Sequence, residues 1–464
     1  MNVNPTWANL PPTYRQKETE FVSRWLNAGE SGSVVGLPGT GRATFLGFLC
    51  HRPDAWQHYL APQLAQVTLV PVDLNNLPDE QLSTLYRVLL RSFYELHTQL
   101  DEPLQQTVLS LYRKVETTQD PFLSQSALRE LLSFFENRGQ RVVLVMNRFD
   151  HFCETATPQM TTTLRGLRDS FKETLSYVMG MAQEVVYLSD MDSIRPLRGI
   201  IDTHVCWVGP LAESDARFMI QRQTQGQTDV IPEPVVARLL AISGGYPSLL
   251  RVLCHWWIRE GQATPPEEWT NTLLSKRNVQ YRLRDIYQGF TQAEQFVLSE
   301  LHQMQTGKKR GKARGEITDS DVLEELWLKG ACFRQGNGWK VQGELIASYV
   351  AQGESPGRGR VWHDESSGEF YQGRSLVEGL QPLPRALLQF LLARPRERHT
   401  HTDIIEAVWP EEVSKDGVST EALYQVVRGI RKAIEPDSTR PRYLINWRGY
   451  MGGGYQFFPE GRPG

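Results

Sequence analysis

Short apolar runs alternate with amphipathic stretches over about the first 210 residues of the chain. The runs are rich in β-branched residues and lie at residues 33–37, 66–74, 141–147, 184–189 and 204–209. Runs of this length that are apolar almost throughout are typical of strands with both faces buried, as in a parallel sheet covered by helices. The pattern therefore predicts an α/β core over residues 1–210.

Helical spacing replaces this pattern from residue 211 onwards. Residues 211–284 carry apolar positions at helical spacing on both sides of a Gly-Gly turn, which predicts a small helical lid. Residues 285–352 indicate helices followed by a hairpin that turns at residues 336–338, the pattern of a winged helix. We interpret residues 353–370 as a linker, because glycine, proline, serine and charged residues occur together there.

Composition narrows the classes of protein that fit. A chain of 464 residues suggests about three domains, and a net charge of -3 excludes a globally basic nucleic-acid binder. The five cysteines are scattered without metal-site spacing, so we expect no metal site. No run approaches the roughly 18 apolar residues of a membrane span, and the first residues lack a signal pattern, which predicts a cytoplasmic protein without a membrane contact.

A glycine-rich loop follows the first predicted strand. Residues 36–44 have the spacing of a phosphate-binding P-loop, with glycines at Gly36, Gly39 and Gly41. The backbone amides of such a loop, together with the N-terminus of the next helix, can hold the phosphates of a nucleotide. The alternative is an ordinary glycine turn between a strand and a helix.

The groups that would hold the γ-phosphate and a metal ion beside this loop are replaced. Arg42 stands at the usual lysine position, Ala43 lacks the magnesium-ligating hydroxyl, and Thr44 comes one position later on the helix. Asn147 ends the apolar run 141–147 where an aspartate is usual, and Asp150 follows nearby. An amide and a methyl group cannot supply the charge and oxygen ligands that hydrated magnesium prefers.

These residues predict a nucleotide site without efficient chemistry. We expect ATP or ADP as the cofactor, magnesium absent or weakly held, and ATP hydrolysis weak or lost. No catalytic residue is assigned, and whether ATP, ADP or nothing fills the loop is left open.

Residues of about 10–280 resemble the STAND class of AAA+-like signalling ATPases. The likeness implies that Arg15 lies near the adenine, that Pro247 packs on the base, and that Ser189 and Asp190 stand at a sensor position. It also implies a nucleotide-dependent switch that governs association of subunits, and hence a homo-oligomer. The plain alternative for Arg15 is a solvated ion pair with a neighbouring glutamate.

Residues 371–464 resemble the OmpR/PhoB type of winged helix-turn-helix. A first helix, a turn, a second helix ending at Trp409, a third helix from Thr420 and a glycine-rich hairpin follow in the order of that family. The third helix has an apolar stripe on one side and polar or basic residues on the other, so its polar side is suited to a DNA major groove. The predicted DNA-binding residues are Thr420, Tyr424, Gln425, Arg428, Arg431, Lys432 and, in the wing, Arg448.

The sequence therefore predicts a P-loop NTPase-type α/β core with a helical lid, followed by two winged-helix domains. We expect a transcriptional regulator of double-stranded DNA whose degenerate nucleotide module controls assembly. Two alternatives stay open. One is a defence or signalling adaptor whose winged helices dock a protein or ribonucleoprotein partner, and the other is an active ATPase that remodels DNA-bound assemblies.

Overall fold

The computed structural model describes most of the chain, in two compact units. The first unit contains residues 1–294 and 319–345, and the second contains residues 295–318 and 346–464. The described residues are 9–61, 67–185, 188, 191–224, 231–306, 320–336, 338–353, 359–364, 368–373, 375–377, 379–409, 418–435, 441–449 and 452–462. No helix in these ranges is both long enough and apolar enough to cross a bilayer.

The first unit is built on a five-stranded sheet with the order β2-β3-β4-β1-β5. Its strands are β1 (Gly32–Val35), β2 (Val67–Val72), β3 (Arg141–Met146), β4 (Leu175–Met181) and β5 (Val205–Trp207). All four neighbouring pairs run parallel. The predicted parallel sheet is confirmed, and the glycine-rich loop follows β1, which lies between β4 and β5, as expected for a P-loop-type core.

One predicted strand was wrong. The run at residues 184–189 was expected to form the fourth strand, but that strand is Leu175–Met181. Ser176 and Gly180 make this segment look less like a strand in the sequence. The glycine has a structural reason, because a Cβ at Gly180 would lie 2.4 Å from the Leu46 side chain of the helix that covers it.

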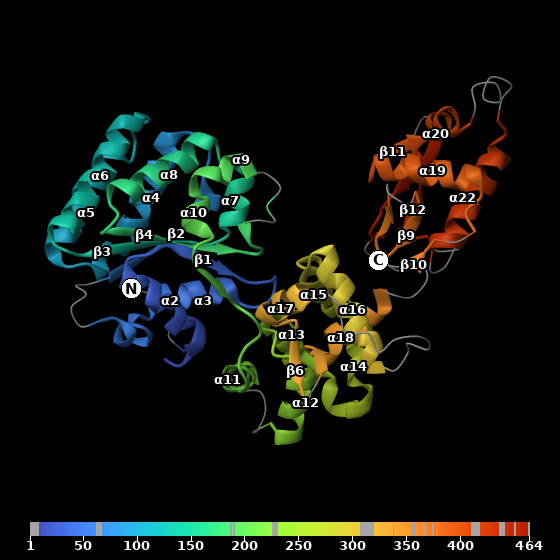
Figure 1. Ribbon diagram of the computed structural model, residues 1–464, viewed down its shortest axis with the longest axis horizontal. Helices are drawn as coiled ribbons and strands as arrows, with labels where there is room; N and C mark the ends of the chain where they lie inside the picture. The colour runs from blue at the N-terminus through green and yellow to red at the C-terminus, as the bar shows by residue number, and fades with distance from the viewer. Residues whose placement is uncertain are drawn as a thin grey trace. The chain divides into compact units, whose positions relative to one another are not determined.

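Helices cover both faces of the sheet (Figure 1). Those of the core are α2 (Gln16–Ala28), α3 (Arg42–His51), α4 (Leu82–Leu96), α5 (Glu102–Val115), α6 (Pro121–Asn137), α7 (Phe149–Thr155), α8 (Pro158–Ser170), α9 (Met191–Ile194) and α10 (Arg198–Ile201). Side chains alternate between the two faces of each strand. Val34 therefore packs with α2 and α3, whereas its neighbour Val35 belongs to the larger cluster formed with α4 to α8.

The predicted lid is helical. It comprises α11 (Glu213–Thr224), α12 (Glu233–Ser243), α13 (Pro247–Arg259), α14 (Trp269–Ser275) and α15 (Arg277–Gln288). Helix α12 ends at Gly244, where φ is 62°, and Gly245 has φ of 79°. Pro247 is the first residue of α13, a position that suits proline because its missing N–H has no partner inside the helix.

Residues 285–352 contain the elements of the first predicted winged helix. They are α16 (Gln292–Thr306), α17 (Ser320–Leu328), β6 (Cys332–Gln335), β7 (Gly338–Val341) and α18 (Glu344–Gly353). The antiparallel pairing of Gln335 with Gly338 confirms the predicted hairpin turn, although Asn337 lies outside the described residues. The two compact units divide this segment, so a separate domain here stays a prediction.

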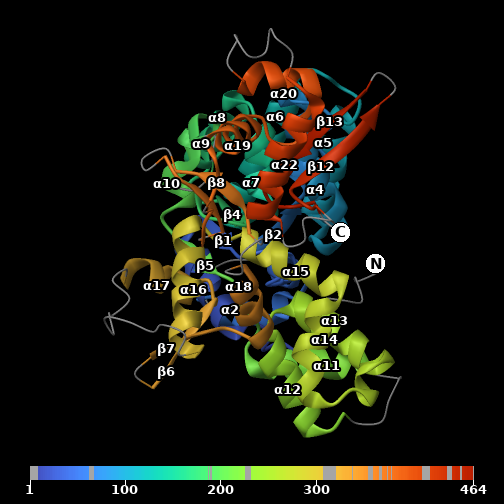
Figure 2. The same ribbon diagram turned by 90° about the vertical axis from the view of Figure 1, so that its right-hand side faces the viewer.

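The second unit ends in a winged helix. Its elements are α19 (Pro382–Ala393), β11 (Arg398–Thr400), α20 (His401–Val408), α22 (Thr420–Ile434), β12 (Leu444–Gly449) and β13 (Gly452–Phe457). The three strands pair in the order β11-β13-β12, and Figure 2 shows α22 beside the long strands of the wing. Leu387, Ile404 and Ile430, one from each helix, are fully buried in a common core.

The stretch predicted as a linker is partly structured. A three-stranded antiparallel sheet consists of β8 (Val361–His363), β9 (Phe370–Gln372) and β10 (Ser375–Leu376). Two of these strands begin inside the predicted linker at 353–370. Val361 and Phe370 are buried in the core of the winged helix, so these strands belong to that domain. Their shortness explains why hydrophobic periodicity did not reveal them.

A buried ion pair joins α16 to the end of α17 within the first unit. The Lys329 Nζ lies 2.5 Å from the Glu294 Oε1, with side-chain exposures of 3% and 0%. The ammonium also lies 5.2 Å from the centre of the Trp207 ring at the end of β5. A second carboxylate oxygen of Glu294 accepts a hydrogen bond from the Thr291 N–H. Each charge is therefore compensated inside the protein.

We predict that Lys329→Met lowers the free energy of unfolding of the first unit by about 3 kcal/mol, because the Glu294 carboxylate stays buried without its partner. Denaturant unfolding followed by tryptophan fluorescence measures this loss. The matched control is Arg24→Gln, which breaks the exposed Arg24–Glu20 pair and should change stability by less than ~0.5 kcal/mol. Equal effects of the two substitutions would contradict the assignment.

Candidate functional site

The glycine loop joins β1 to α3. Gly39 and Gly41 have φ of 86° and 87°, in the left-handed region that favours glycine. Gly41 is the N-cap of α3, so the free amides of the first helical turn lie beside the loop. Gly36 is required for space, since a Cβ there would lie 2.8 Å from the Thr40 Oγ1 and 2.9 Å from the Val208 carbonyl oxygen. Glycine is therefore favoured at Gly39 and Gly41 by the backbone conformation and required at Gly36 by lack of space.

The N-terminus of the lid helix α13 lies directly on this loop. The Ser248 N–H donates a hydrogen bond of 3.1 Å to the Gly39 carbonyl oxygen. A Cβ at Gly39 would lie 2.3 Å from the Ser248 Oγ, and a Cβ at Gly41 would lie 3.4 Å from the Pro247 Cγ. Pro247 thus lies against the loop, and its predicted packing on the base stays a prediction. Ser248, which the sequence did not single out, makes the closer contact.

The lid turn before α13 also contacts the β6–β7 hairpin segment. The Gln342 Nε2 donates a hydrogen bond of 2.8 Å to the Gly244 carbonyl oxygen, and a Cβ at Gly244 would lie 2.8 Å from the Gly343 Cα. The Tyr246 hydroxyl donates to the Gly330 carbonyl oxygen at 3.3 Å. The same turn of five residues therefore contacts the hairpin segment at one end and the phosphate loop at the other.

Arg15 is buried beside the loop, with an exposure of 2%. Its Nη2 donates to the carbonyl oxygens of Thr40, at 2.5 Å, and Gly209, at 2.9 Å. Its Nη1 pairs with Glu18 at 2.7 Å, and its backbone N–H donates to the Asp215 Oδ2 at 2.9 Å. The solvated-pair alternative does not describe this side chain. Arg15 joins the loop to the lid, because Asp215 lies in α11.

Arg42 begins α3 and turns its guanidinium back towards the loop. Its Nη1 donates to the Gly36 carbonyl oxygen at 3.5 Å. Burial lowers the pKa of Arg42, the nearby Asp150 carboxylate raises it, and the charge of Arg148 lowers it. The group stays cationic at neutral pH, because the guanidinium pKa is far above 7. A positive charge is therefore held at the loop without lysine.

Several buried polar atoms around the loop lack a hydrogen-bond partner among the residues that the structure describes. They are the Arg15 Nε, the Arg42 Nε, the Ser248 Oγ and the Asn147 Oδ1. Buried polar atoms are rarely left without partners in folded proteins. Two of these four are cationic N–H donors and one is a hydroxyl, which suits a polyanion such as a nucleotide phosphate.

The predicted metal positions do not fit a divalent cation. Ala43 is exposed and offers no oxygen, and Thr44 lies in the first turn of α3, half-buried. Asn147 comes directly after β3, and its side chain is an amide where a carboxylate is usual. The Asp150 Oδ2 accepts a hydrogen bond of 2.6 Å from the Ala182 N–H at the end of β4, so this carboxylate joins α7 to the sheet. The donor set matches a phosphate group better than magnesium.

Two further predictions can be placed only in part. Within the described ranges no group of three or more His, Cys, Asp or Glu residues could hold a metal ion. The predicted sensor pair Ser189 and Asp190 lies outside the described residues.

The predicted recognition helix α22 has the expected two sides. Leu423, Val427 and Ile430 are buried in the core. The exposed side carries Tyr424, Gln425, Arg428 and Lys432. Residues 424, 428 and 432 recur every four positions and so lie on one face of the helix. Two cations and two hydrogen-bonding groups are therefore presented together at the surface of this unit.

Thr420 and Arg448 are placed by their backbones only. Thr420 is the first residue of α22, and its N-cap Ser419 accepts a hydrogen bond from the Ala422 N–H through its side chain. Arg448 lies in β12. Their side chains lie outside the described part of the chain, so their predicted contacts with DNA stay predictions.

Arg431 is held by the wing, and its predicted contact with DNA stays a prediction. Its Nε and Nη2 donate to the Leu444 carbonyl oxygen at 3.0 and 2.7 Å, and Nη2 also donates to the Asn446 Oδ1 at 2.5 Å. The guanidinium lies 5.7 Å from the centre of the Tyr455 ring, and burial lowers its pKa. Arg431 therefore fixes the wing to the recognition helix, and no feature of the sequence separated it from Arg428.

The wing is held at a second point that the sequence did not indicate. Glu435 follows α22 and is buried. Its Oε1 accepts hydrogen bonds from the N–H groups of Tyr443, at 2.9 Å, and Leu444, at 2.8 Å. Its Oε2 accepts one from the Arg442 N–H at 2.6 Å. A charge-assisted acceptor thus satisfies the backbone at the start of β12.

Comparisons with known proteins find similar solved structures and one matching family model. Among solved structures, the chain is similar to the Walker-type ATPase PABY2304 of Pyrococcus abyssi, with 15% identity and a TM-score of 0.43 over 73% of this chain and 95% of that chain. It is also similar to the ADP form of Aeropyrum pernix ORC2, with 12% identity and a TM-score of 0.38 over 74% and 95% of the two chains. Aeropyrum pernix ORC1 in complex with DNA shares 13% identity, with a TM-score of 0.36 over 73% and 92%.

These scores are too low to extend the description of the fold beyond the strand order given above. The comparison with curated proteins finds no match. Residues 378–457 match the family model described as "Transcriptional regulatory protein, C terminal". The final winged helix is therefore similar to the DNA-binding domain of transcriptional regulators.

Proposed function

We propose that this protein is a DNA-binding transcriptional regulator controlled by a nucleotide-binding module that does not depend on magnesium. The observation that carries the proposal is the exposed polar and basic face of α22 in a winged helix of the transcriptional-regulator type. Arginine and lysine on a recognition helix bind phosphates and guanine edges, and glutamine pairs with adenine. A local cationic face of this kind suits DNA although the whole chain is slightly acidic.

The phosphate loop is the second part of the proposal. The loop amides, the N-terminus of α3 and the Arg42 guanidinium would hold the phosphates of ATP or ADP. Bound nucleotide would supply a polyanion between loop and lid. The Ser248 hydroxyl, buried without a partner in the described structure, would donate to it from the lid side.

This arrangement can act as a switch without hydrolysis. A ligand shifts a conformational equilibrium whenever it binds one state more tightly than the other. Pro247 and Ser248 contact the loop, so a phosphate there interacts with the closed lid and loses that interaction when the lid opens. We propose that lid closure in turn governs self-association, and with it the spacing of the winged helices on DNA.

The active-ATPase alternative is less well supported. The Asp150 carboxylate acts on the charge of Arg42, and its oxygens accept hydrogen bonds from the N–H groups of Ala182 and His151. An adaptor whose winged helices dock a protein would not need a cationic recognition face, whereas one that docks a ribonucleoprotein could use such a face on the RNA phosphates. Weak DNA binding without sequence preference would favour that adaptor.

We predict that Arg428→Ala weakens binding to DNA about tenfold, or ~1.4 kcal/mol, because the exposed guanidinium faces the nucleic acid. The measurement is fluorescence anisotropy of the full-length protein with a duplex that the wild-type chain enriches from a random pool. Lys432→Ala should reduce the slope of log affinity against log salt concentration by about 1, as expected for the loss of one phosphate contact.

Two control variants distinguish the loss of a DNA contact from the loss of stability of the fold. Arg113→Ala removes an exposed cation from α5 and should leave DNA affinity unchanged. Arg431→Ala should lower the melting temperature of the winged helix, because it removes the hydrogen bonds to Leu444 and Asn446. Unchanged DNA affinity in both Arg428→Ala and Lys432→Ala would exclude this face as the reader.

We predict that the protein binds a fluorescent ADP analogue with the same affinity in excess magnesium chloride and in excess EDTA. Arg42→Ala should weaken this binding at least about tenfold, since a charge-assisted contact with phosphate is lost. The control is Lys17→Gln, which removes an exposed cation two residues from Arg15.

A variant with the usual P-loop residues makes the same test more specific. Arg42→Lys restores the usual phosphate-binding cation, and Ala43→Ser and Asn147→Asp restore the usual magnesium-ligating oxygens, so the triple variant should bind the analogue more tightly with magnesium than with EDTA. Magnesium-dependent binding already present in the wild type would refute our account of these three positions.

A further inference from the structure

An arginine near the end of β3 has a backbone conformation that arginine rarely adopts. Arg148 has φ of 56° and ψ of 41°, in the left-handed region. Three non-glycine residues of the described ranges have a positive φ, and one of the others is Arg15, which bonds to the phosphate loop. This conformation costs free energy for side chains other than glycine, asparagine and aspartate, and strained residues are concentrated at functional sites.

The start of a helix is a second unfavourable feature of this position. Arg148 is the N-cap of α7, and its side chain makes no capping hydrogen bond. N-caps favour asparagine, aspartate or serine, whose short side chains accept hydrogen bonds from the free N–H groups of the first turn. The helix dipole also disfavours a cation at this end. Asparagine would suit both the left-handed backbone and the cap, so stability of the fold does not explain an arginine here.

The end of β3 lies against α3, the helix that follows the phosphate loop. Side chains alternate along a strand, and those two and four positions before Asn147 pack with α2 and α3. A Cβ at Gly180 of β4 would touch the Leu46 side chain of α3 and lie 3.2 Å from the Asn147 Oδ1. Leu46 is four positions after Arg42 and so lies on the same face of α3. The residue before Arg148 is therefore close to the face of α3 that carries Arg42.

Two cations and one carboxylate interact at this place. Burial has the largest effect on the pKa of Arg42 and lowers it, the Asp150 carboxylate raises it, and the charge of Arg148 lowers it. The Asp150 oxygens accept hydrogen bonds from the N–H groups of Ala182 and His151. The Arg148 guanidinium is exposed and has no ion pair within the described part of the chain. The three charged groups thus leave one positive charge in excess, which favours an anion.

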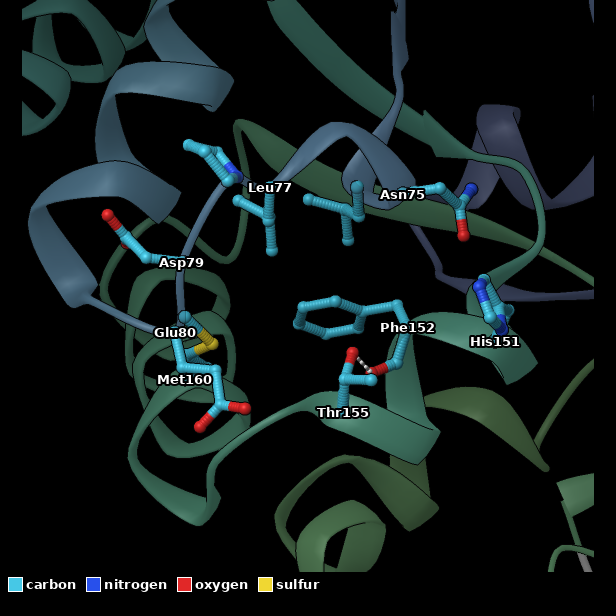
Figure 3. A pocket seen from close by; sticks show the side chains of 10 residues that line it. Asn75, Leu77, Asp79, Glu80, His151, Phe152, Thr155 and Met160 are labelled. Carbon is cyan, nitrogen blue, oxygen red and sulfur yellow. Dashed lines mark hydrogen bonds between the residues drawn. The ribbon is translucent and has the colours of Figure 1, made fainter.

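The peptide that precedes Arg148 is held by the segment after β2. The Asn75 Nδ2 donates to the Asn147 carbonyl oxygen at 3.4 Å and to the Asp73 Oδ1 at 3.1 Å. Figure 3 shows Asn75 and His151 on the same side of the pocket that this segment forms with α7. These contacts restrict the backbone from which the arginine side chain extends.

We propose that Arg148 binds the terminal phosphate of ATP, so that the site prefers ATP to ADP without magnesium. An aspartate at the position of Asn147 would help to hold a metal ion that bridges the β- and γ-phosphates, which places this end of β3 on the γ-phosphate side of the loop. A guanidinium there supplies N–H donors and positive charge to the phosphate oxygens. This inference rests on the proposed nucleotide function and adds the group that distinguishes ATP from ADP.

Displacement of the fluorescent ADP analogue by unlabelled ATP and ADP tests the inference, with the full-length protein in excess EDTA. We expect ATP to displace the analogue at a concentration about fivefold lower than ADP, a gain between those of an exposed ion pair and a charge-assisted hydrogen bond. Arg148→Asn should abolish this preference and leave the affinity for ADP within about twofold, since ADP lacks the phosphate that Arg148 contacts. Arg148→Lys should keep part of the preference, because the charge remains.

Thermal unfolding of Arg148→Asn distinguishes a ligand contact from a structural role. The melting temperature should rise, because asparagine suits a left-handed N-cap. A residue that only supports the fold would give the opposite change. Arg113→Gln removes an exposed cation from α5 and is the control, which should leave both nucleotide affinities unchanged.

The outcomes separate this inference from the proposed function. Failure of the wild type to bind the ADP analogue would refute the proposed nucleotide function and this inference with it. If the analogue binds, equal displacement by ATP and ADP would overturn the inference alone, and so would an ATP preference that persists in Arg148→Asn. A lower melting temperature of Arg148→Asn with equal loss of ATP and ADP binding would show a structural role and also overturn it.

Discussion

The contact between Gly39 and Ser248 is the constraint on which the first unit depends. It joins the backbone of the phosphate loop to the backbone of the lid helix through a hydrogen bond of 3.1 Å, with no side chain between them. Side chains can adopt other rotamers when a neighbour moves, but backbones in direct contact cannot. Any change in the shape of the loop must therefore be accommodated by movement of α13.

The same constraint extends beyond the loop. The turn before α13 also lies against Gly343, and Tyr246 adds a hydrogen bond to Gly330. The loop thus contacts the lid, and the lid contacts the hairpin segment. Both contacts include backbone atoms on each side. Arg15 adds a parallel connection, because it bonds to both Thr40 of the loop and Asp215 of the lid. Two independent connections make a coupled movement of loop and lid more probable than independent movements.

Replacement of lysine by arginine is consistent with loss of the metal positions. A guanidinium is larger than an ammonium and carries its charge in a planar group with several N–H donors. Arg42 uses one nitrogen on the Gly36 carbonyl and leaves its buried Nε free within the described structure. A cation that is anchored in this way can neutralise phosphate charge where no magnesium ion is held. In the proposed function, Arg42, Ala43 and Asn147 would act together in one phosphate site that does not depend on magnesium.

Patterns that depend on neighbours in the chain were predictable, and those that depend on tertiary contacts were not. The glycines of the loop, the recognition helix from Thr420 and the hairpin turn could be predicted because each follows from local conformation. The strand Leu175–Met181 was missed because Gly180 serves the approach of a helix, which local periodicity does not encode. The narrower resemblance to the STAND class stays a prediction.

Two arginines of α22 show the same limit of sequence-based prediction within the candidate site. Arg428 and Arg431 are three positions apart on one helix and are chemically identical. Only Arg431 finds carbonyl and amide oxygens of β12 within reach, and these oxygens arrive from residues 13 and 15 positions later in the chain. The burial that follows makes Arg431 a structural cation. The contacts of Arg431 with the wing could therefore not be read from the composition of the helix, and the DNA contacts proposed for α22 stay predictions.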